Sequence, residues 1–137
     1  MDTHSITSFH NQGMSFTAHI NGHKLTTDSN SEGAGEGPSP KRLMLASLAG
    51  CTGIDVVSIL TKMKVPYSEF SIDVQASLTE NQPQIYHAVK VTYKIKMDIV
   101  NRSKMEKAVK LSEEKYCGVW ASLKDSIKID YKIEIIE

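Results

Sequence analysis

The sequence has no excess of charge of either sign. Its 137 residues include 16 basic and 16 acidic side chains, for a formal net charge of +0. A protein that binds nucleic acid or a membrane surface by electrostatic attraction needs a surplus of Lys and Arg, so this balance argues against both classes. Arginine itself is scarce, since the chain contains only Arg42 and Arg102.

Targeting and membrane signals are also missing. The first five residues, MDTHS, lack the basic start and apolar run of a secretory signal peptide. No segment has the roughly 18 continuous apolar residues typical of a membrane span. We therefore expect a cytoplasmic protein, in which a permanent disulfide between the two cysteines, Cys51 and Cys117, is not expected.

Several motifs of catalysis and metal binding are absent. The chain has no Cys-x-x-Cys pair for zinc, and no Gly-x-Ser-x-Gly of a serine hydrolase. Its one His-x-x-x-His spacing, His19 and His23, flanks the predicted hairpin turn, and the other histidines are scattered, which argues against a zinc site. The glycine-rich stretch 28–40 lacks the Gly-Lys-Ser/Thr ending of a phosphate-binding loop, so we predict a plain loop there. For a Cys–His hydrolase, His87 is the one histidine that we consider, and such a residue is more often a partly buried structural one.

The most distinctive stretch that is present is a long apolar helix, predicted over residues 40–64. Ser39 suits its N-cap, Pro40 suits its first position, and Pro66 ends it. From residue 43 onward the segment is apolar on nearly every side, which predicts a helix buried in the core. A narrow stripe of small polar side chains and one thiol follows one side at helical spacing: Ser47, Cys51, Asp55 and Ser58.

Alternating apolar and polar residues predict strands on both sides of this helix. Asn21-Gly22, the signal of a type I′ turn, predicts a hairpin. The predicted strands are an edge strand near Ile6 and Phe9, then 14–20, 23–27, 70–78, 85–99 and 127–135.

A second helix is predicted to begin with a capping box at residues 103–106. This helix would place four residues on one side: Met105, Val109, Ser112 and Tyr116. Strands and helices in blocks predict an α+β fold, with antiparallel sheets packed on the long central helix and a single domain over residues 1–137.

The two cysteines are the candidates for chemistry. Cys51 and Cys117 lie 66 positions apart, so only the fold can bring them together. A reactive cysteine needs its thiolate form, which a nearby cation favours, whereas Asp55, one turn after Cys51, would raise the thiol pKa by repulsion. Each cysteine alone is most often a small buried side chain, but two of them, each beside a glycine in a helical context, weaken that interpretation.

Two stretches resemble the cysteine motifs of the OsmC/Ohr superfamily. Residues 38–57, PSPKRLMLASLAGCTGIDVV, resemble its first cysteine helix, and residues 114–117, EKYC, resemble its second motif. The separation of the cysteines and the order of elements fit over nearly the whole chain. Residues 50–55, GCTGID, are most similar to the branch described as predicted redox proteins.

The resemblance implies an intertwined homodimer and thiol-dependent reduction of organic hydroperoxides in oxidative-stress defence. Cys51 would be the peroxidatic thiolate, and Cys117 would resolve its sulfenate as a disulfide. A dithiol, such as a lipoylated protein, would reduce the pair again. The resemblance implies no metal, flavin, haem or nucleic acid.

The sequence departs from the superfamily at two positions that supply or orient the positive charge beside the peroxidatic thiolate. Its peroxidases hold the thiolate with an Arg from the N-terminal region, and a Pro-Glu pair orients that Arg. Here no Arg precedes Arg42, and the matching pair is Pro40-Lys41. Lys41 and Asp55 are therefore the candidate supporting residues, and a redox-sensing or ligand-binding module without peroxidase activity is the alternative function.

Overall fold

The structure, a computed structural model, describes residues 1–29 and 35–137, which form two compact units, Met1–Met44 and Leu45–Glu137. The first unit holds β1 (Thr7–His10), β2 (Phe16–Ile20) and β3 (His23–Thr27) in an antiparallel sheet of order β1-β2-β3. The predicted hairpin is present, because Asn21 and Gly22 have φ values of 47° and 82° between β2 and β3. Both are the positive values that a type I′ turn requires.

The segment after β3 is a loop, as predicted, where the structure describes it. The Asp28 carboxylate accepts the Glu36 backbone N–H at 3.1 Å, and the Asp28 N–H donates to the Pro38 carbonyl at 3.1 Å. Residues 30–34 of the predicted loop lie outside the described residues. A side chain at Gly37 would collide with the Thr26 carbonyl, so this close approach of two backbones requires glycine.

Helix α1 (Pro40–Lys62) begins at the predicted proline. It ends in a Schellman motif, in which the Val65 N–H donates to the Leu60 carbonyl and the Lys64 N–H to the Thr61 carbonyl, both at 3.0 Å. Lys64 takes the left-handed conformation of this motif, with φ of 58°, and Pro66 follows it. By length and composition α1 could also cross a membrane, but core helices of folded domains pass the same test.

The prediction that α1 is buried on nearly every side is wrong for a single chain. Its buried residues recur every four positions and form one stripe: Leu48, Thr52, Val56 and Leu60. On another side Ile54 is 72% exposed and Val57 is 38% exposed. The helix therefore packs against its own chain along one face and leaves an apolar face open.

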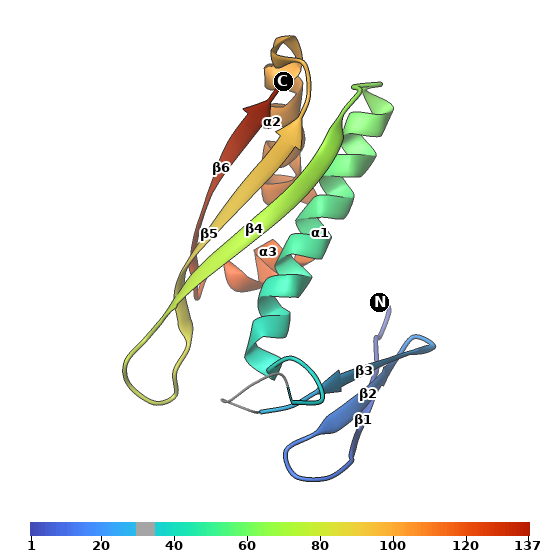
Figure 1. The fold of residues 1–137 in the computed structure, drawn as a ribbon, viewed down its shortest axis with the longest axis vertical. Coiled ribbons are helices and arrows are strands. Elements are labelled where there is room, and N and C mark those ends of the chain that lie inside the picture. The colour runs from blue at the N-terminus through green and yellow to red at the C-terminus, as the bar shows by residue number, and fades with distance from the viewer. Residues whose placement is uncertain (30–34) are drawn as a thin grey trace. The chain divides into compact units, whose positions relative to one another are not determined.

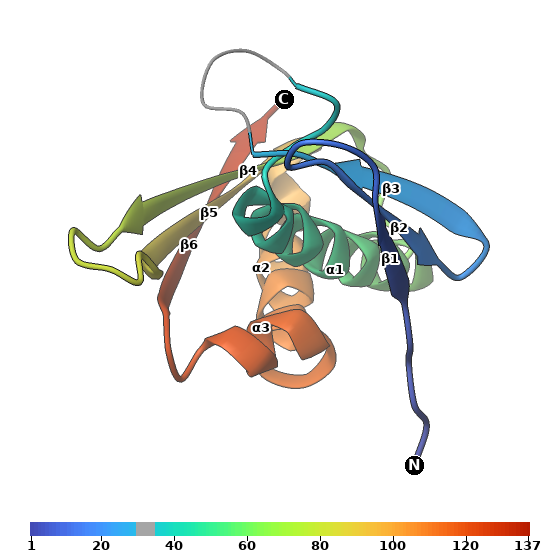
Figure 2. The ribbon, with the colours of Figure 1, turned by 90° about the horizontal axis from the view of Figure 1, so that it is seen from below.

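The second unit contains a sheet of order β4-β5-β6, formed by β4 (Ser68–Leu78), β5 (Tyr86–Lys96) and β6 (Lys128–Ile136). Strands β4 and β5 form the predicted antiparallel hairpin, but β6 pairs with β5 in parallel. The prediction of purely antiparallel sheets is therefore wrong for this pair. A parallel partner requires a crossover, and the helical segment between β5 and β6 supplies it on the face of the sheet where α1 lies (Figures 1 and 2).

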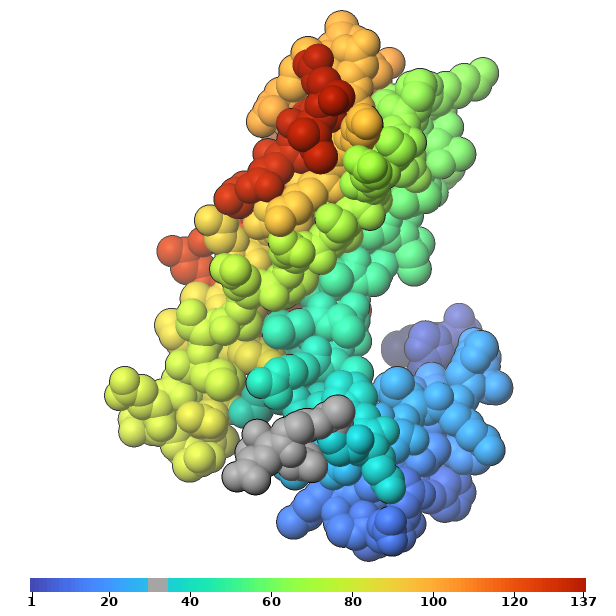
Figure 3. Space-filling view, in the orientation of Figure 1, coloured from blue at the N-terminus to red at the C-terminus, as the bar shows by residue number. Residues whose placement is uncertain are grey.

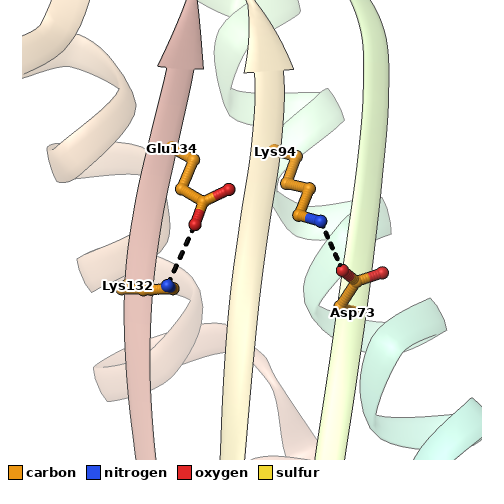
Figure 4. Close-up of polar contacts among 4 residues, drawn as sticks. All are labelled: Asp73, Lys94, Lys132 and Glu134. Carbon is orange, nitrogen blue, oxygen red and sulfur yellow. Dashed lines mark ion pairs between the residues drawn. The ribbon is translucent and has the colours of Figure 1, made fainter.

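The opposite face of this sheet is polar. Figure 3 shows β4, β5 and β6, in green to red, uncovered on the side toward the viewer. Exposed ion pairs cross or follow the strands there, with Lys94 Nζ 2.7 Å from Asp73 and Lys132 Nζ 2.9 Å from Glu134 (Figure 4). Such pairs contribute about 1 kcal/mol or less each, so they mark the solvent face rather than hold the sheet together.

The crossover runs through η1 (Ile99–Asn101), α2 (Arg102–Leu111), η2 (Ser112–Tyr116) and α3 (Gly118–Leu123). The predicted capping box is wrong, because α2 begins at Arg102 and Asn101 precedes it without a side-chain cap. Asp98 instead caps the short helix η1 by accepting the Val100 N–H at 3.0 Å. Glu106 pairs with Arg102 at 3.0 Å, as residues one turn apart on a helix can.

The core of the second unit lies between the helices and β5. Fully buried side chains come from α1, β5 and α2, among them Leu60, Tyr93, Ile95, Met105 and Val109. The apolar side chains that β5 and the helices bury against one another hold these elements together. Each buried aliphatic side chain contributes about 1.5–3 kcal/mol to the free energy of folding.

We predict that Leu60→Ala destabilises the protein by about 2–5 kcal/mol, because it removes a fully buried side chain and leaves a cavity. Val100→Ala is the control, since Val100 is 76% exposed, and should change the stability by less than about 0.5 kcal/mol. Chemical denaturation of both variants gives the two free energies of unfolding. Equal losses would contradict this account of the core.

Candidate functional site

Three side chains that could carry chemistry converge in the second unit. The sulfur atoms of Cys51 and Cys117 and a carboxylate oxygen of Asp55 all lie within 4.8 Å of one another. Cys51 and Asp55 are four positions apart on α1, so they point to the same side of that helix. The structure therefore brings together the two predicted cysteines and one of the two predicted supporting residues.

A π-helical turn places Cys117. Over Ser112–Tyr116 the helix widens, and the Cys117 N–H donates to the Ser112 carbonyl, five residues earlier, at 2.8 Å. The wider turn rotates the chain relative to α2, so Tyr116 is exposed and Cys117 is only 3% exposed. The prediction that Tyr116 lies on the same side of the helix as Met105, Val109 and Ser112, which are buried, is wrong for this reason. Such turns often occur at functional sites.

Cys117 also caps the following helix. Its backbone is extended, with φ of −79° and ψ of 103°, and its sulfur accepts the Trp120 N–H at 3.3 Å. This contact fixes the sulfur between the end of η2 and the start of α3. Trp120 is itself buried, so the position of the thiol depends on core packing.

Asp55 is held by a hydrogen bond across the fold. The fully buried Ser112 hydroxyl donates to the Asp55 carboxylate at 2.8 Å, joining residues 57 positions apart. Among residues 1–29 and 35–137, no ion pair includes Asp55. The bond orients one carboxylate oxygen toward Ser112 and keeps the side chain beside the two thiols.

The electrostatics of the site favour a neutral Cys117. Burial and, to a smaller extent, the neighbouring Cys51 side chain raise the pKa of Cys117 to about 11, although the Trp120 backbone N–H acts to lower it. Cys117 is therefore a thiol at neutral pH. This gives the two sulfurs different characters, because Cys51 is only partly buried.

Tyr93 of β5 is a buried polar group that the sequence did not single out. Burial raises the pKa of Tyr93 to about 12, and the neighbouring Cys117 also acts to raise it. Within the described part of the chain its hydroxyl has no hydrogen-bond partner. The nearby Thr52 lowers the Tyr93 pKa, but its hydroxyl donates to the Leu48 carbonyl at 3.0 Å. The sequence feature that could have indicated this buried hydroxyl is the position of Tyr93 on the apolar side of a predicted strand.

Of the other residues considered from the sequence, His87 does not join the site. His87 is exposed, because a β-bulge leaves it outside the pairs that Tyr86 and Ala88 make with Leu78 and Ser77. This removes the support for a Cys–His hydrolase. Lys41 belongs to the first unit, so its role beside Cys51 stays a prediction.

A cavity of about 490 Å³ lies next to the site and reaches Asp55. It is lined by α1, α2 and η2, with Ser58, Lys62, Lys107 and Tyr116 among its residues. The two lysines place positive charge at this cavity. The cavity meets the site at Asp55, and neither cysteine is among the described residues that line it.

Comparison with known proteins identifies the family. The family described as OsmC-like protein matches residues 33–132. The chain belongs to the OsmC-like family. Protein YhfA of Escherichia coli K12 is 28% identical over 126 residues, which cover 91% of this chain and 92% of YhfA.

Solved structures of other proteins share the fold. A hypothetical protein from Aquifex aeolicus is 27% identical, with a TM-score of 0.85 and full coverage of both chains. The organic hydroperoxide resistance protein OhrB of Bacillus subtilis is 19% identical, with a TM-score of 0.62 and coverage of 98% of each chain. At that identity, the likeness to OhrB shows the fold alone. The predicted superfamily is thus confirmed, while the reaction is not decided by it.

The different burial of the two thiols and the raised pKa of Cys117 predict a large difference in their alkylation. In native Cys117→Ser protein, the partly exposed Cys51 should react readily with iodoacetamide. In native Cys51→Ser protein, the buried Cys117 should react slowly at pH 8, where a pKa near 11 leaves roughly one thiol in a thousand as thiolate.

Raising the pH should accelerate labelling of Cys117 about tenfold per unit, since the reactive thiolate increases in that proportion below its pKa. Mass spectrometry of timed samples measures both rates, and unfolded protein controls for intrinsic reactivity. Equal rates for the two thiols in native protein at pH 8 would show that burial does not distinguish them.

Proposed function

We propose that this OsmC-like chain reduces organic hydroperoxides with Cys51 and Cys117, as part of defence against oxidative stress. The observation that carries the proposal is the closeness of the two sulfurs, which lie within 4.8 Å although 66 residues separate them. An S–S bond is about 2 Å long, so a modest rotation of the side chains would close it.

Cys51 is the residue that meets the peroxide, because its side chain is partly exposed and that of Cys117 is buried. The Cys51 thiolate attacks one oxygen of the hydroperoxide, and the O–O bond breaks. The alcohol leaves with a proton from the medium, and Cys51 is oxidised to a sulfenic acid. The adjacent cavity gives the substrate its approach along Asp55.

Cys117 then resolves the sulfenic acid. Its sulfur attacks Cys51, the S–O bond breaks, and the departing hydroxide takes the Cys117 proton and leaves as water. Since the pKa of Cys117 is about 11, this thiol stays protonated until an acceptor is next to it. A small dithiol, such as a lipoyl group, then reduces the disulfide and restores both thiols.

We further propose a homodimer in the cytoplasm. Members of the OsmC/Ohr family are generally dimeric. The open face of α1 supports this arrangement here, because Gly50 and Gly53 are small and Ile54 and Val57 are exposed. Together with Phe70 and Ile72 they line an apolar cavity of about 710 Å³ that a second copy could fill.

A redox-sensing or ligand-binding role is the second candidate, and Asp55 favours it. Its carboxylate lies beside both sulfurs, where a negative charge opposes formation of a thiolate. Of the two arginines, Arg102 pairs with Glu106, and Arg42 donates to Ser39 at 3.0 Å within the first unit. In this alternative Cys51 is oxidised without sustained turnover.

Turnover of an alkyl hydroperoxide with a dithiol tests the proposed reaction. Cys51→Ser should abolish turnover, because it removes the sulfur that attacks the peroxide. Cys117→Ser should still consume one equivalent of hydroperoxide but leave a sulfenic acid, which dimedone traps. A control variant at an exposed site, Ser122→Ala, should behave as the native protein. Undiminished turnover in Cys51→Ser would overturn the proposal, and single oxidation without turnover in the native protein would favour the sensor.

Analytical ultracentrifugation tests the proposed dimer. Ile54→Lys should shift the protein toward the monomer, because it places a charge in the open apolar face of α1. Val100→Lys, at an equally exposed site on η1, is the matched control and should leave the assembly unchanged. A native protein that sediments as a monomer at all concentrations would contradict the dimer.

A further inference from the structure

The cysteine site combines three groups that each ligate metals, and the sequence alone gave no sign of it. Spacing along the chain argued against zinc, because the two cysteines are far apart and no Cys-x-x-Cys is present. The fold places Cys51, Asp55 and Cys117 with their ligand atoms within 4.8 Å of one another. We propose that these three side chains bind a Zn²⁺ ion.

The distances suit a tetrahedral ion. Zinc–sulfur bonds of about 2.3 Å place two ligand sulfurs roughly 3.8 Å apart around one tetrahedral centre. The observed spread of up to 4.8 Å therefore requires the ligand atoms to approach by about 1 Å at most, which side-chain rotation supplies. Cys51 and Asp55 are one turn apart on α1, the spacing at which two helical side chains reach the same ion.

The ligand types also suit Zn²⁺, which displaces the protons of thiol ligands when it binds. With both thiols ionised, the two sulfurs and the Asp55 carboxylate bring three negative charges into a partly buried space. No ion pair within residues 1–29 and 35–137 neutralises Asp55. Two thiolates select soft ions such as Zn²⁺ over Mg²⁺ or Ca²⁺, which prefer oxygen ligands.

Neighbouring hydrogen bonds already orient two of the ligands. The Ser112 hydroxyl holds Asp55 at 2.8 Å, and the Trp120 N–H approaches the Cys117 sulfur at 3.3 Å. Outer contacts of this kind fix ligand geometry in zinc sites. Three protein ligands leave the fourth position for water or a small molecule, which the cavity beside Asp55 can admit.

Bound Zn²⁺ would change what the thiols do. Its bonds to both sulfurs would draw electron density from them and so lower the nucleophilicity with which Cys51 attacks a peroxide and Cys117 resolves the product. The ion would thus protect the reduced pair and silence peroxide chemistry until it is removed. Zinc binding itself requires only the three ligands, so it stands whether or not the chain is a peroxidase.

Titration of the reduced, chelator-treated full chain with Zn²⁺ alone, in competition with a chromophoric chelator, tests the proposal. We expect one Zn²⁺ per chain, and loss of this binding in Cys51→Ser and Asp55→Asn. Ser112→Ala should weaken it about 10–100-fold, because that change removes only the hydrogen bond that orients a ligand. Asp73→Asn is the matched control, since Asp73 is an exposed carboxylate on β4, and should bind as the native protein.

Co²⁺ gives a second readout that does not depend on activity. A thiolate-to-cobalt charge-transfer band should appear in the native protein and be absent from Cys51→Ser. Circular dichroism of each variant without metal shows that it has folded. No Zn²⁺ bound by the native protein, or equal binding in Asp55→Asn and Asp73→Asn, would overturn the site. Peroxide turnover measured separately, without metal, decides the proposed function independently.

Discussion

The hydrogen bond from Ser112 to Asp55 is the contact on which the geometry of the site depends. It joins α1 to the π-helical turn η2 at a distance of 2.8 Å. Cys51 lies one turn before Asp55, and Cys117 lies five residues after Ser112, so this one bond sets both cysteines in place. A buried hydroxyl without a partner costs about 1–3 kcal/mol. Loss of the Ser112–Asp55 hydrogen bond would therefore destabilise the arrangement of α1 and η2.

The same contact gives the site its unusual electrostatic character. It holds a carboxylate beside two thiols. Burial raises the pKa of Cys117 to about 11 and keeps this thiol neutral, so the thiolate of the proposed reaction is that of the more exposed Cys51. The charge that would stabilise this thiolate has to come from a lysine, a partner or a metal ion. The proposed peroxidase requires such a charge, whereas the proposed Zn²⁺ would supply one and would occupy both thiols at the same time.

Much of the fold could be predicted from local sequence signals. Asn21-Gly22 specified its hairpin turn, Pro40 marked the start of α1, and alternation located the long strands. The cysteine motifs identified the family, which residues 33–132 confirm. These features depend on a few neighbouring residues, so periodicity and turn chemistry are enough to find them.

The remaining features depend on single inserted residues or on long-range pairing. The π-helical turn before Cys117 and the β-bulge at His87 each shift the phase of a regular element without changing its composition. For this reason the sequence pattern predicted that Tyr116 lies on the same side of its helix as Met105. It likewise placed His87 on the apolar side of its strand, although both residues are exposed. Parallel pairing of β6 and the Ser112–Asp55 bond join distant segments, and no local pattern encodes either.

The central claim is that Cys51 and Cys117 act as one redox pair. Non-reducing peptide mapping by mass spectrometry, after one equivalent of an organic hydroperoxide is added to the reduced, metal-free protein, tests it most directly. The account predicts one new crosslinked species, in which the peptide of Cys51 is joined to that of Cys117 within a single chain. Both thiols recovered free, or Cys51 oxidised with Cys117 still reduced, would contradict the claim.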